Sequence, residues 1–319
     1  MTNLKIDFET AFSQVQKETA RILTKGPGLV SGYTSYLSNA TGKMMRAKAV
    51  LACSMDKEGL VSKDAVYFAA AVEILHLATL VHDDIMDDAD TRRGQVTLHR
   101  KSGDRVAVIC GDYLLAAAIK ELTHATQDDK YKSFDFSKYV QSIAIGELRQ
   151  TVNNKNFRLN DYRYFTIIDG KTAALFEASY HAGSLAGDND LKRVNLFKKL
   201  GRFTGIIFQL TDDCIDYENT KETAMKPVLS DYENGVITLP LIHAFSEEPE
   251  LIDKAEAGLL SKEQIIEKVE AHDGVGYTHK VAEKFYKKGL SILKSLDLCG
   301  LQEEILTGLL QKAYVGLKG

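Results

Sequence analysis

Hydrophobic residues recur at intervals of three and four positions along most of the chain, which is the period of an amphipathic α-helix. Strict alternation of apolar and polar residues, typical of strands, is scarce. Only four prolines occur in 319 residues, so long helices can form without interruption. The pattern predicts an all-α protein with helices at roughly 5–24, 28–39, 43–56, 63–88, 104–124, 134–154, 160–185, 190–218, 236–246, 261–271, 275–295 and 301–315.

Two polar stretches separate the predicted helices, at residues 88–103 and 219–235. The second contains Pro227 and is long enough to serve as a functional lid. No repeat, low-complexity tract or linker divides the chain. We therefore expect residues 1–319 to form a single helical domain.

Composition excludes several classes of protein. Lys and Arg number 40 against 44 Asp and Glu, and this net charge of -4 argues against a nucleic-acid partner. The four cysteines lie far apart and the first 20 residues do not resemble a secretory leader, so we expect a cytoplasmic protein. Glu73 and His76 interrupt the most apolar stretch, residues 69–81, which predicts no membrane span.

Two clusters of aspartates each follow an apolar helical segment. In the first, Asp83 and Asp87 are four residues apart and share one helix face, with Asp84 beside them. The second has the same spacing in Asp212, Asp213 and Asp216. Like charges at this spacing destabilise a helix slightly, so an unpaired cluster is unfavourable.

A divalent cation gives these clusters a function. Mg²⁺ prefers one or two carboxylates together with waters and the phosphate oxygens of a substrate. The alternative is two acidic helix ends that face solvent. Two copies of the arrangement, about 125 residues apart, favour magnesium bound with a diphosphate over that alternative.

Cationic and polar residues lie near the clusters in the sequence. Each alone is more typical of a solvated surface, but together they indicate an anion site. They are Lys43, Arg46, Arg92, Arg93, Lys171, Thr172, Gln209 and Lys226.

The sequence resembles the trans-isoprenyl (polyprenyl) diphosphate synthase family over nearly its whole length. The resemblance is greatest to bacterial medium- and long-chain enzymes, including the catalytic subunit of two-component heptaprenyl synthases. The matching motifs occur in the family's order: Gly42-Lys43, Glu73-x-x-His76, Asp83 to Arg93, Lys171-Thr172, Phe208 to Asp216, Lys226-Pro227, Asp231 and Thr238-Leu239-Pro240.

The resemblance implies the isoprenoid synthase fold, a helical bundle whose two aspartate clusters face each other across a deep central cavity. It implies a homodimer that binds Mg²⁺ through Asp83, Asp87 and Asp212, with Asp84, Asp213 and Asp216 as ligands or holders of metal-bound water. The implied catalytic residues are Asp83, Asp84, Asp87, Arg92, Lys171 and Asp212. The allylic diphosphate is assigned to Arg92, Lys171, Thr172, Gln209 and Lys226, and isopentenyl diphosphate to Lys43, Arg46, His76 and Arg93.

Three positions depart from the family pattern. Met44 stands in a segment that usually carries one more cation, Ala224-Met225 replaces the glycine before Lys226, and Val236 stands where a lysine is common. These changes weaken anion binding, which leaves a heteromer with a small partner subunit as a second expectation.

The expected reaction is head-to-tail condensation. Bound Mg²⁺ and the cations stabilise the charge that builds on the leaving diphosphate, and an apolar cavity protects the allylic cation. The released diphosphate is the expected proton acceptor, with His82 as the weaker candidate. Ala78 and Thr79, one turn before Asp83, are expected to set chain length; because neither is aromatic, a C30–C40 product is predicted.

Other interpretations remain at this point. The chain could be a short-chain synthase, a terpene cyclase or a weakly active subunit of a heteromer. Two Glu-x-x-His segments, Glu73 to His76 and Glu121 to His124, fit a di-iron bundle, although that class leaves both aspartate clusters unexplained. A phosphohydrolase that uses His82-Asp83 would release orthophosphate instead of diphosphate.

Overall fold

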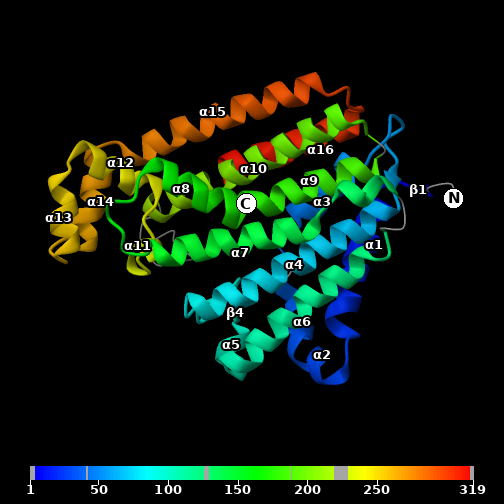
Figure 1. The fold of residues 1–319 in the computed structure, drawn as a ribbon, viewed down its shortest axis with the longest axis horizontal. Helices are drawn as coiled ribbons and strands as arrows, with labels where there is room; N and C mark the ends of the chain where they lie inside the picture. The colour runs from blue at the N-terminus through cyan, green and yellow to red at the C-terminus, as the bar shows by residue number, and fades with distance from the viewer. Residues whose placement is uncertain (1–3, 41, 126–128, 188, 219–228, 317–319) are drawn as a thin grey trace. The chain divides into compact units, whose positions relative to one another are not determined.

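The computed structural model describes residues 4–40, 42–125, 129–187, 189–218 and 229–316. Helices dominate these residues, and the strands form two short antiparallel pairs, β1 with β2 and β3 with β4 (Figure 1). The all-α prediction is confirmed. Two compact units are present, Met1–Asp135 with Ala178–Lys198 and Leu296–Leu306, and Phe136–Glu177 with Lys199–Ser295 and Thr307–Gly319. That all residues form one domain stays a prediction.

The first unit is built around α4 (Asp64–Met86), which lies beside α6 (Asp104–Leu122) (Figure 1). The unit also contains β1 (Lys5–Ile6), α1 (Phe8–Thr24), α2 (Gly28–Thr34), the 3-10 helix η1 (Ser35–Ala40), α3 (Met45–Cys53), β2 (Val61–Ser62), β3 (Thr91–Arg92), β4 (Gln95–Val96), α5 (Leu98–Ser102) and the 3-10 helix η2 (Asp129–Ser133).

Helix α4 is apolar on nearly every side, as a central core helix must be. By length and composition it could cross a membrane, but 72% of its apolar window is buried inside the protein. Phe68 packs on Tyr131 and Phe134, with ring centroids 5.0 and 5.4 Å apart. These contacts and the burial of its other residues place α4 in the core of the unit, and the first aspartate cluster lies at its C-terminal end.

The second unit contains helices that pack around a separate core. They are α7 (Phe136–Val152), α8 (Asp161–Ile168), the π-helix η3 (Asp169–Ala173), α11 (Ser230–Glu233), α12 (Leu239–Glu247), α13 (Glu250–Glu256), α14 (Lys262–Ala271) and α15 (Gly274–Ser295). Three helices have residues in both units: α9 (Ala174–Ala186), α10 (Leu191–Glu218) and α16 (Gly300–Val315).

The segment predicted as one helix over 160–185 contains a π turn. The N–H of Ala174 donates to the carbonyl of Asp169, five residues earlier. Helix α7 approaches this turn closely: a Cβ added at Gly146 would lie 2.6 Å from the carbonyl carbon of Gly170. Only glycine allows this contact, and π turns are frequent at functional sites.

The structure of the polar stretches and of residues 5–6 differs from the prediction. Residues 88–103 fold into the β3–β4 hairpin and α5, and residues 5–6 pair in β1 instead of opening the first helix. Most of the predicted lid, including Pro227, lies outside the described residues; the part described contains α11.

Candidate active site

The first aspartate cluster ends α4 as predicted. Asp83 is half-buried and Asp87 is exposed, and the N–H of Asp87 donates to the carbonyl of Asp83 at 2.8 Å. Asp84 differs from both because it is only 5% exposed. A helix turns by about 100° per residue, so Asp84 lies to one side of Asp83, at helical spacing from the buried residues Leu77 and Val81.

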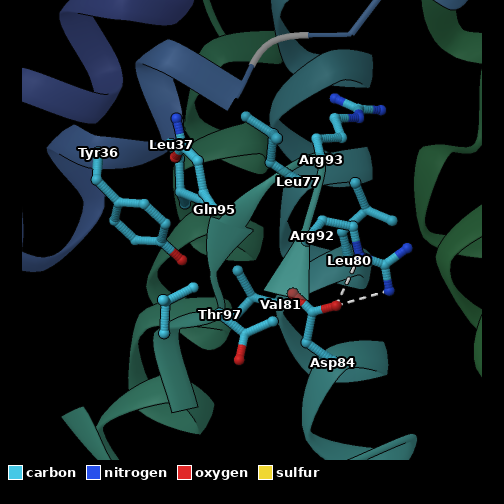
Figure 2. A pocket seen from close by; sticks show the side chains of 11 residues that line it. Tyr36, Leu37, Leu77, Leu80, Val81, Asp84, Arg92, Arg93, Gln95 and Thr97 are labelled. Atoms are coloured by element: carbon cyan, nitrogen blue, oxygen red, sulfur yellow. Dashed lines mark hydrogen bonds and ion pairs between the residues drawn. The ribbon is translucent and has the colours of Figure 1, made fainter. Parts of the chain in front are cut away.

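Asp84 binds Arg92 of the β3–β4 hairpin. The Nε and Nη2 atoms of Arg92 each lie 2.6 Å from Oδ1 of Asp84 (Figure 2). Burial raises the pKa of Asp84 above its usual value, while the guanidinium of Arg92 opposes the rise. Asp84 therefore orients an arginine next to the cluster.

The charges of three arginines act on His76 of α4. Burial lowers the pKa of His76 well below its usual value, and the charges of Arg46, Arg93 and Arg92 lower it further. The ring is therefore neutral at physiological pH. The backbone N–H of Ala47 donates to Glu73 at 2.9 Å, and burial raises the pKa of this carboxyl group. We use the name arginine cluster for five residues: Arg46, Arg92, Arg93, His76 and Glu73.

Burial also lowers the pKa of Arg46, to about 10, with Glu73 opposing the change and Arg93 adding to it. The guanidinium remains charged at neutral pH. Gly42 gives Arg93 room, because a Cβ there would lie 2.6 Å from Nη2 of Arg93. The predicted Gly42-Lys43 motif thus lies against the arginine cluster. Three guanidinium groups accompany two carboxylates here, Glu73 and the Asp84 that binds Arg92, and this excess of positive charge favours an anion.

An apolar pocket lies between η1, α4 and the hairpin (Figure 2). Leu77, Leu80 and Val81 line it from α4, and Tyr36 lines it from η1. Burial raises the pKa of Tyr36 to about 12, and the nearby charge of Asp84 contributes to this rise. The Asp84–Arg92 pair borders this pocket.

The second aspartate cluster lies near the end of α10, in the second unit. Asp212 is exposed and Asp216 is half-buried, whereas Asp213 is 2% exposed. The hydroxyl of Tyr164 donates to Oδ2 of Asp213 at 2.5 Å, and Nε2 of Gln209 donates to Oδ1 at 2.8 Å. Burial raises the pKa of Asp213 to about 8, with Asp231 adding to it.

Gln209 links this cluster to the π turn. The hydroxyl of Thr172 donates to Oε1 of Gln209 at 2.7 Å. The predicted residues Thr172, Gln209 and Asp213 therefore form one hydrogen-bonded chain that ends at Tyr164. Lys171, next to Thr172, forms an ion pair with Glu147 of α7 at 3.0 Å.

Both clusters offer oxygen donors that suit a small hard cation. In each, two carboxylates stand one helical turn apart with at least one exposed, Asp87 in the first and Asp212 in the second. Within the described ranges, no group of three or more His, Cys, Asp or Glu side chains gathers as a ready-made metal site. This arrangement fits Mg²⁺, which uses few protein carboxylates and takes its other ligands from water and phosphate.

The remaining predicted residues have the following positions. Lys43 is exposed before α3, Ala78 is 2% exposed, and Thr79 is half-buried on α4. Lys226 lies outside the described residues. Sequence reasoning missed Glu147 and Tyr164, whose partners are 24 and 49 residues away, so no local motif marks them.

His82 lies against α6. Its Nε2 is 3.3 Å from the carbonyl oxygen of Val108 and 3.6 Å from a carboxylate oxygen of Asp112. A Cβ at Gly111 would lie 2.5 Å from the ring. The ring is therefore engaged with α6, which weakens its candidacy as the proton acceptor.

Comparison with known proteins identifies relatives along most of the chain. The Polyprenyl synthetase family model matches residues 28–272. Heptaprenyl diphosphate synthase component 2 of Bacillus subtilis is 30% identical over 287 residues, covering 88% of this chain and 81% of that protein. Geranylgeranyl diphosphate synthase of Sulfolobus acidocaldarius is 34% identical over 281 residues, covering 82% and 83%.

Solved structures agree with this result. Heptaprenyl diphosphate synthase from Staphylococcus aureus superposes with a TM-score of 0.88 at 27% identity, covering 98% of this chain and 99% of that one. A polyprenyl synthase from Caulobacter crescentus, complexed with calcium and isoprenyl diphosphate, gives a TM-score of 0.85 at 26% identity, covering 97% and 95%.

Proposed function

Because this chain belongs to the polyprenyl synthetase family, we propose that it condenses isopentenyl diphosphate head to tail with an allylic diphosphate and releases inorganic diphosphate. The product is an all-trans polyprenyl diphosphate. The observation that carries the proposal is the arginine cluster next to the first aspartate cluster, where Arg92 binds Asp84 at 2.6 Å and Gly42 leaves room for the guanidinium of Arg93. Such a site suits a strongly anionic substrate next to bound cations.

Magnesium is the proposed cofactor. Asp83 and Asp87 would hold it at the first cluster, and Asp212, Asp213 and Asp216 at the second. When bound, the cation neutralises the diphosphate so that it can leave with the bonding electrons. The exposed Asp87 and Asp212 support direct contact with the ion, and the two hydrogen bonds on the buried Asp213 would hold that carboxylate in place as it binds the ion or a metal-bound water.

The substrates divide between two groups of residues. We assign isopentenyl diphosphate to Lys43, Arg46, His76 and Arg93, which all belong to the first unit. We assign the allylic diphosphate to Arg92, Lys171, Thr172, Gln209 and Lys226. The catalytic residues are Asp83, Asp84, Asp87, Arg92, Lys171 and Asp212, and Asp84 acts by orienting Arg92.

The proton that isopentenyl diphosphate loses is assigned to the released diphosphate. Diphosphate carries several negative charges, and the reaction releases it next to the carbon that must lose the proton. The contact of His82 with the carbonyl of Val108 supports this choice over the imidazole.

We propose a C30–C40 product. Ala78 and Thr79 are small side chains one turn before Asp83, so the growing chain meets no aromatic ring there. The resemblance to heptaprenyl synthases supports the range. A shorter C20 product is the alternative, favoured by the similarity to a geranylgeranyl diphosphate synthase.

A cytoplasmic homodimer is the proposed assembly. The relative named component 2 supports a heteromer with a small subunit as the second candidate. In that case, activity would depend on the partner.

The test incubates the purified chain with isopentenyl diphosphate, a fifteen-carbon allylic diphosphate and Mg²⁺. The proposal expects one diphosphate per isopentenyl unit consumed, products of thirty to forty carbons, and no turnover with a chelator. Release of orthophosphate, or no diphosphate from a folded protein alone or with its partner, contradicts it.

A further inference from the structure

Three residues, Asp88 to Asp90, connect the first aspartate cluster to the hairpin that carries Arg92 and Arg93. This connection begins in a strained conformation, because Asp88 has a φ of +50°. Its direction decides where the two arginines lie relative to Asp83 and Asp87. The residues that fix this connection therefore bear on the proposed reaction, and the inference below rests on that proposed function.

Two buried side chains, Thr97 just before α5 and His99 within it, contact the connection. The hydroxyl of Thr97 donates to the carbonyl of Ala89 at 2.7 Å, and Nε2 of His99 lies 2.7 Å from the same oxygen. A carbonyl only accepts, so Nε2 of His99 carries the proton. Thr97 is 1% exposed and His99 is 5% exposed, so water does not compete for these bonds.

Arg100 holds the two aspartates on either side of Ala89. Its Nη2 lies 3.0 Å from the carbonyl oxygen of Asp88 and 2.8 Å from the carboxylate of the same residue. Its Nε lies 2.7 Å from the carboxylate of Asp90. Arg100 therefore also compensates the negative charge of two acidic side chains next to the cluster.

The hairpin continues directly from this fixed point. The N–H of Thr97 donates to the carbonyl of Asp90 at 3.1 Å, and Arg92 pairs with Gln95 across the two strands. From there Arg92 reaches back to Asp84 on α4. A shift of Ala89 would move Arg92 and Arg93 together, and a displacement of about 1 Å at such groups can cost about a hundredfold in rate.

We propose that His99 and Arg100 are positioning residues of the reaction: through the backbone of residues 88–90 they hold Arg92 and Arg93 in register with the Mg²⁺-binding aspartates. Neither touches substrate. Their loss weakens diphosphate binding, while the site for the hydrocarbon chain is unchanged.

Two variants of His99 separate its hydrogen bond to Ala89 from the other contacts of the imidazole ring. Glutamine places its amide N–H near the position of Nε2, and asparagine places it near that of Nδ1. His99→Gln therefore keeps the bond to Ala89, and His99→Asn keeps only the side facing Asp104, whose carboxylate is 3.3 Å from Nδ1. Arg100→Met removes contacts at the surface, where loss of ion pairs costs little stability. Arg105→Met, an exposed arginine of α6, is the matched control.

The readouts are KM for both substrates, kcat, product length, and the inhibition constant of inorganic diphosphate. If part of the protein is misfolded, the apparent kcat falls in proportion to the active enzyme that is lost. KM and the inhibition constant do not change. We expect His99→Asn and Arg100→Met to raise KM and that inhibition constant by about tenfold, a modest part of the hundredfold cost of a 1 Å shift. In His99→Gln and Arg105→Met we expect KM and the inhibition constant to stay within about twofold of wild type. Product length should be unchanged in every variant.

The inference is overturned if His99→Asn and Arg100→Met keep wild-type KM and inhibition constants, or if His99→Gln is as impaired as His99→Asn. Should His99→Asn fail to fold, the result for Arg100→Met decides alone. An inactive wild-type protein would instead refute the proposed function, so the two failures are distinguishable.

Discussion

Replacing Gly146 with alanine tests how the second unit positions Lys171. A Cβ at this position would lie 2.6 Å from the carbonyl carbon of Gly170 and 2.9 Å from its Cα, both backbone atoms of the π turn. Ordinary carbon contacts are about 3.5–4.0 Å, so α7 and the turn must separate by roughly 1 Å. Overpacking of this kind costs about 1–3 kcal/mol.

The activity effect should be larger than the stability effect. Because the turn carries Lys171 and Thr172, a shift of about 1 Å predicts a fall of about a hundredfold in kcat/KM for the allylic substrate. Denaturant unfolding and steady-state kinetics measure the two quantities.

Gly308→Ala is the matched control for this substitution. Gly308 lies within α16, and a Cβ there would meet nothing within 4 Å. The change should stabilise the protein by up to about 1 kcal/mol through helix propensity and leave activity unchanged. A Gly146→Ala protein with wild-type stability and kinetics would refute the argument from close packing.

Three further predictions use other parts of the molecule. Thr79→Phe should shorten the product, measured by chromatography of the hydrolysed alcohols; an unchanged distribution contradicts the assignment of Thr79. Tyr164→Phe removes the buried donor to Asp213 and should cost about 1–3 kcal/mol of unfolding free energy in urea; no loss would show the bond to be energetically neutral. Burial, with Glu18 nearby, raises the pKa of Glu121 from 4.5 to about 7, so the folded state binds the proton more tightly and stability falls as pH rises through this window. Glu121→Gln should therefore be more stable than wild type at pH 8 and not at pH 5, and equal differences at both pH values would contradict this.

The helical pattern allowed the fold class and the positions of the aspartate clusters to be predicted. Long segments such as α4, α6 and α10 were located within a few residues because they are rich in helix-forming residues and contain no proline. The β3–β4 hairpin was missed because each strand has two residues and no alternating apolar pattern. The π turn was missed because a single wider turn leaves the spacing of apolar residues almost unchanged.

The family resemblance already gave Asp84 and Asp213 a different role from Asp83 and Asp212, and the structure shows that Asp84 and Asp213 also differ by being buried. Asp84 continues the buried face of Leu77 and Val81 at helical spacing, so its burial could have been anticipated. Asp213 follows Ile206 and Leu210 in the same way. Their partners could not be predicted, because Arg92 reaches Asp84 through a hairpin and Tyr164 reaches Asp213 from another helix.

We propose that Asp83 and Asp212 both act on the leaving diphosphate through bound magnesium, and this claim decides the mechanism. A double-mutant cycle on Asp83→Asn and Asp212→Asn, with kcat/KM for the allylic substrate measured at saturating Mg²⁺, tests this claim most directly. We expect each substitution to lower kcat/KM by about a thousandfold and the double variant to be far less impaired than the product of the two effects. Wild-type kcat/KM in either single variant, or two effects that simply multiply, would contradict it.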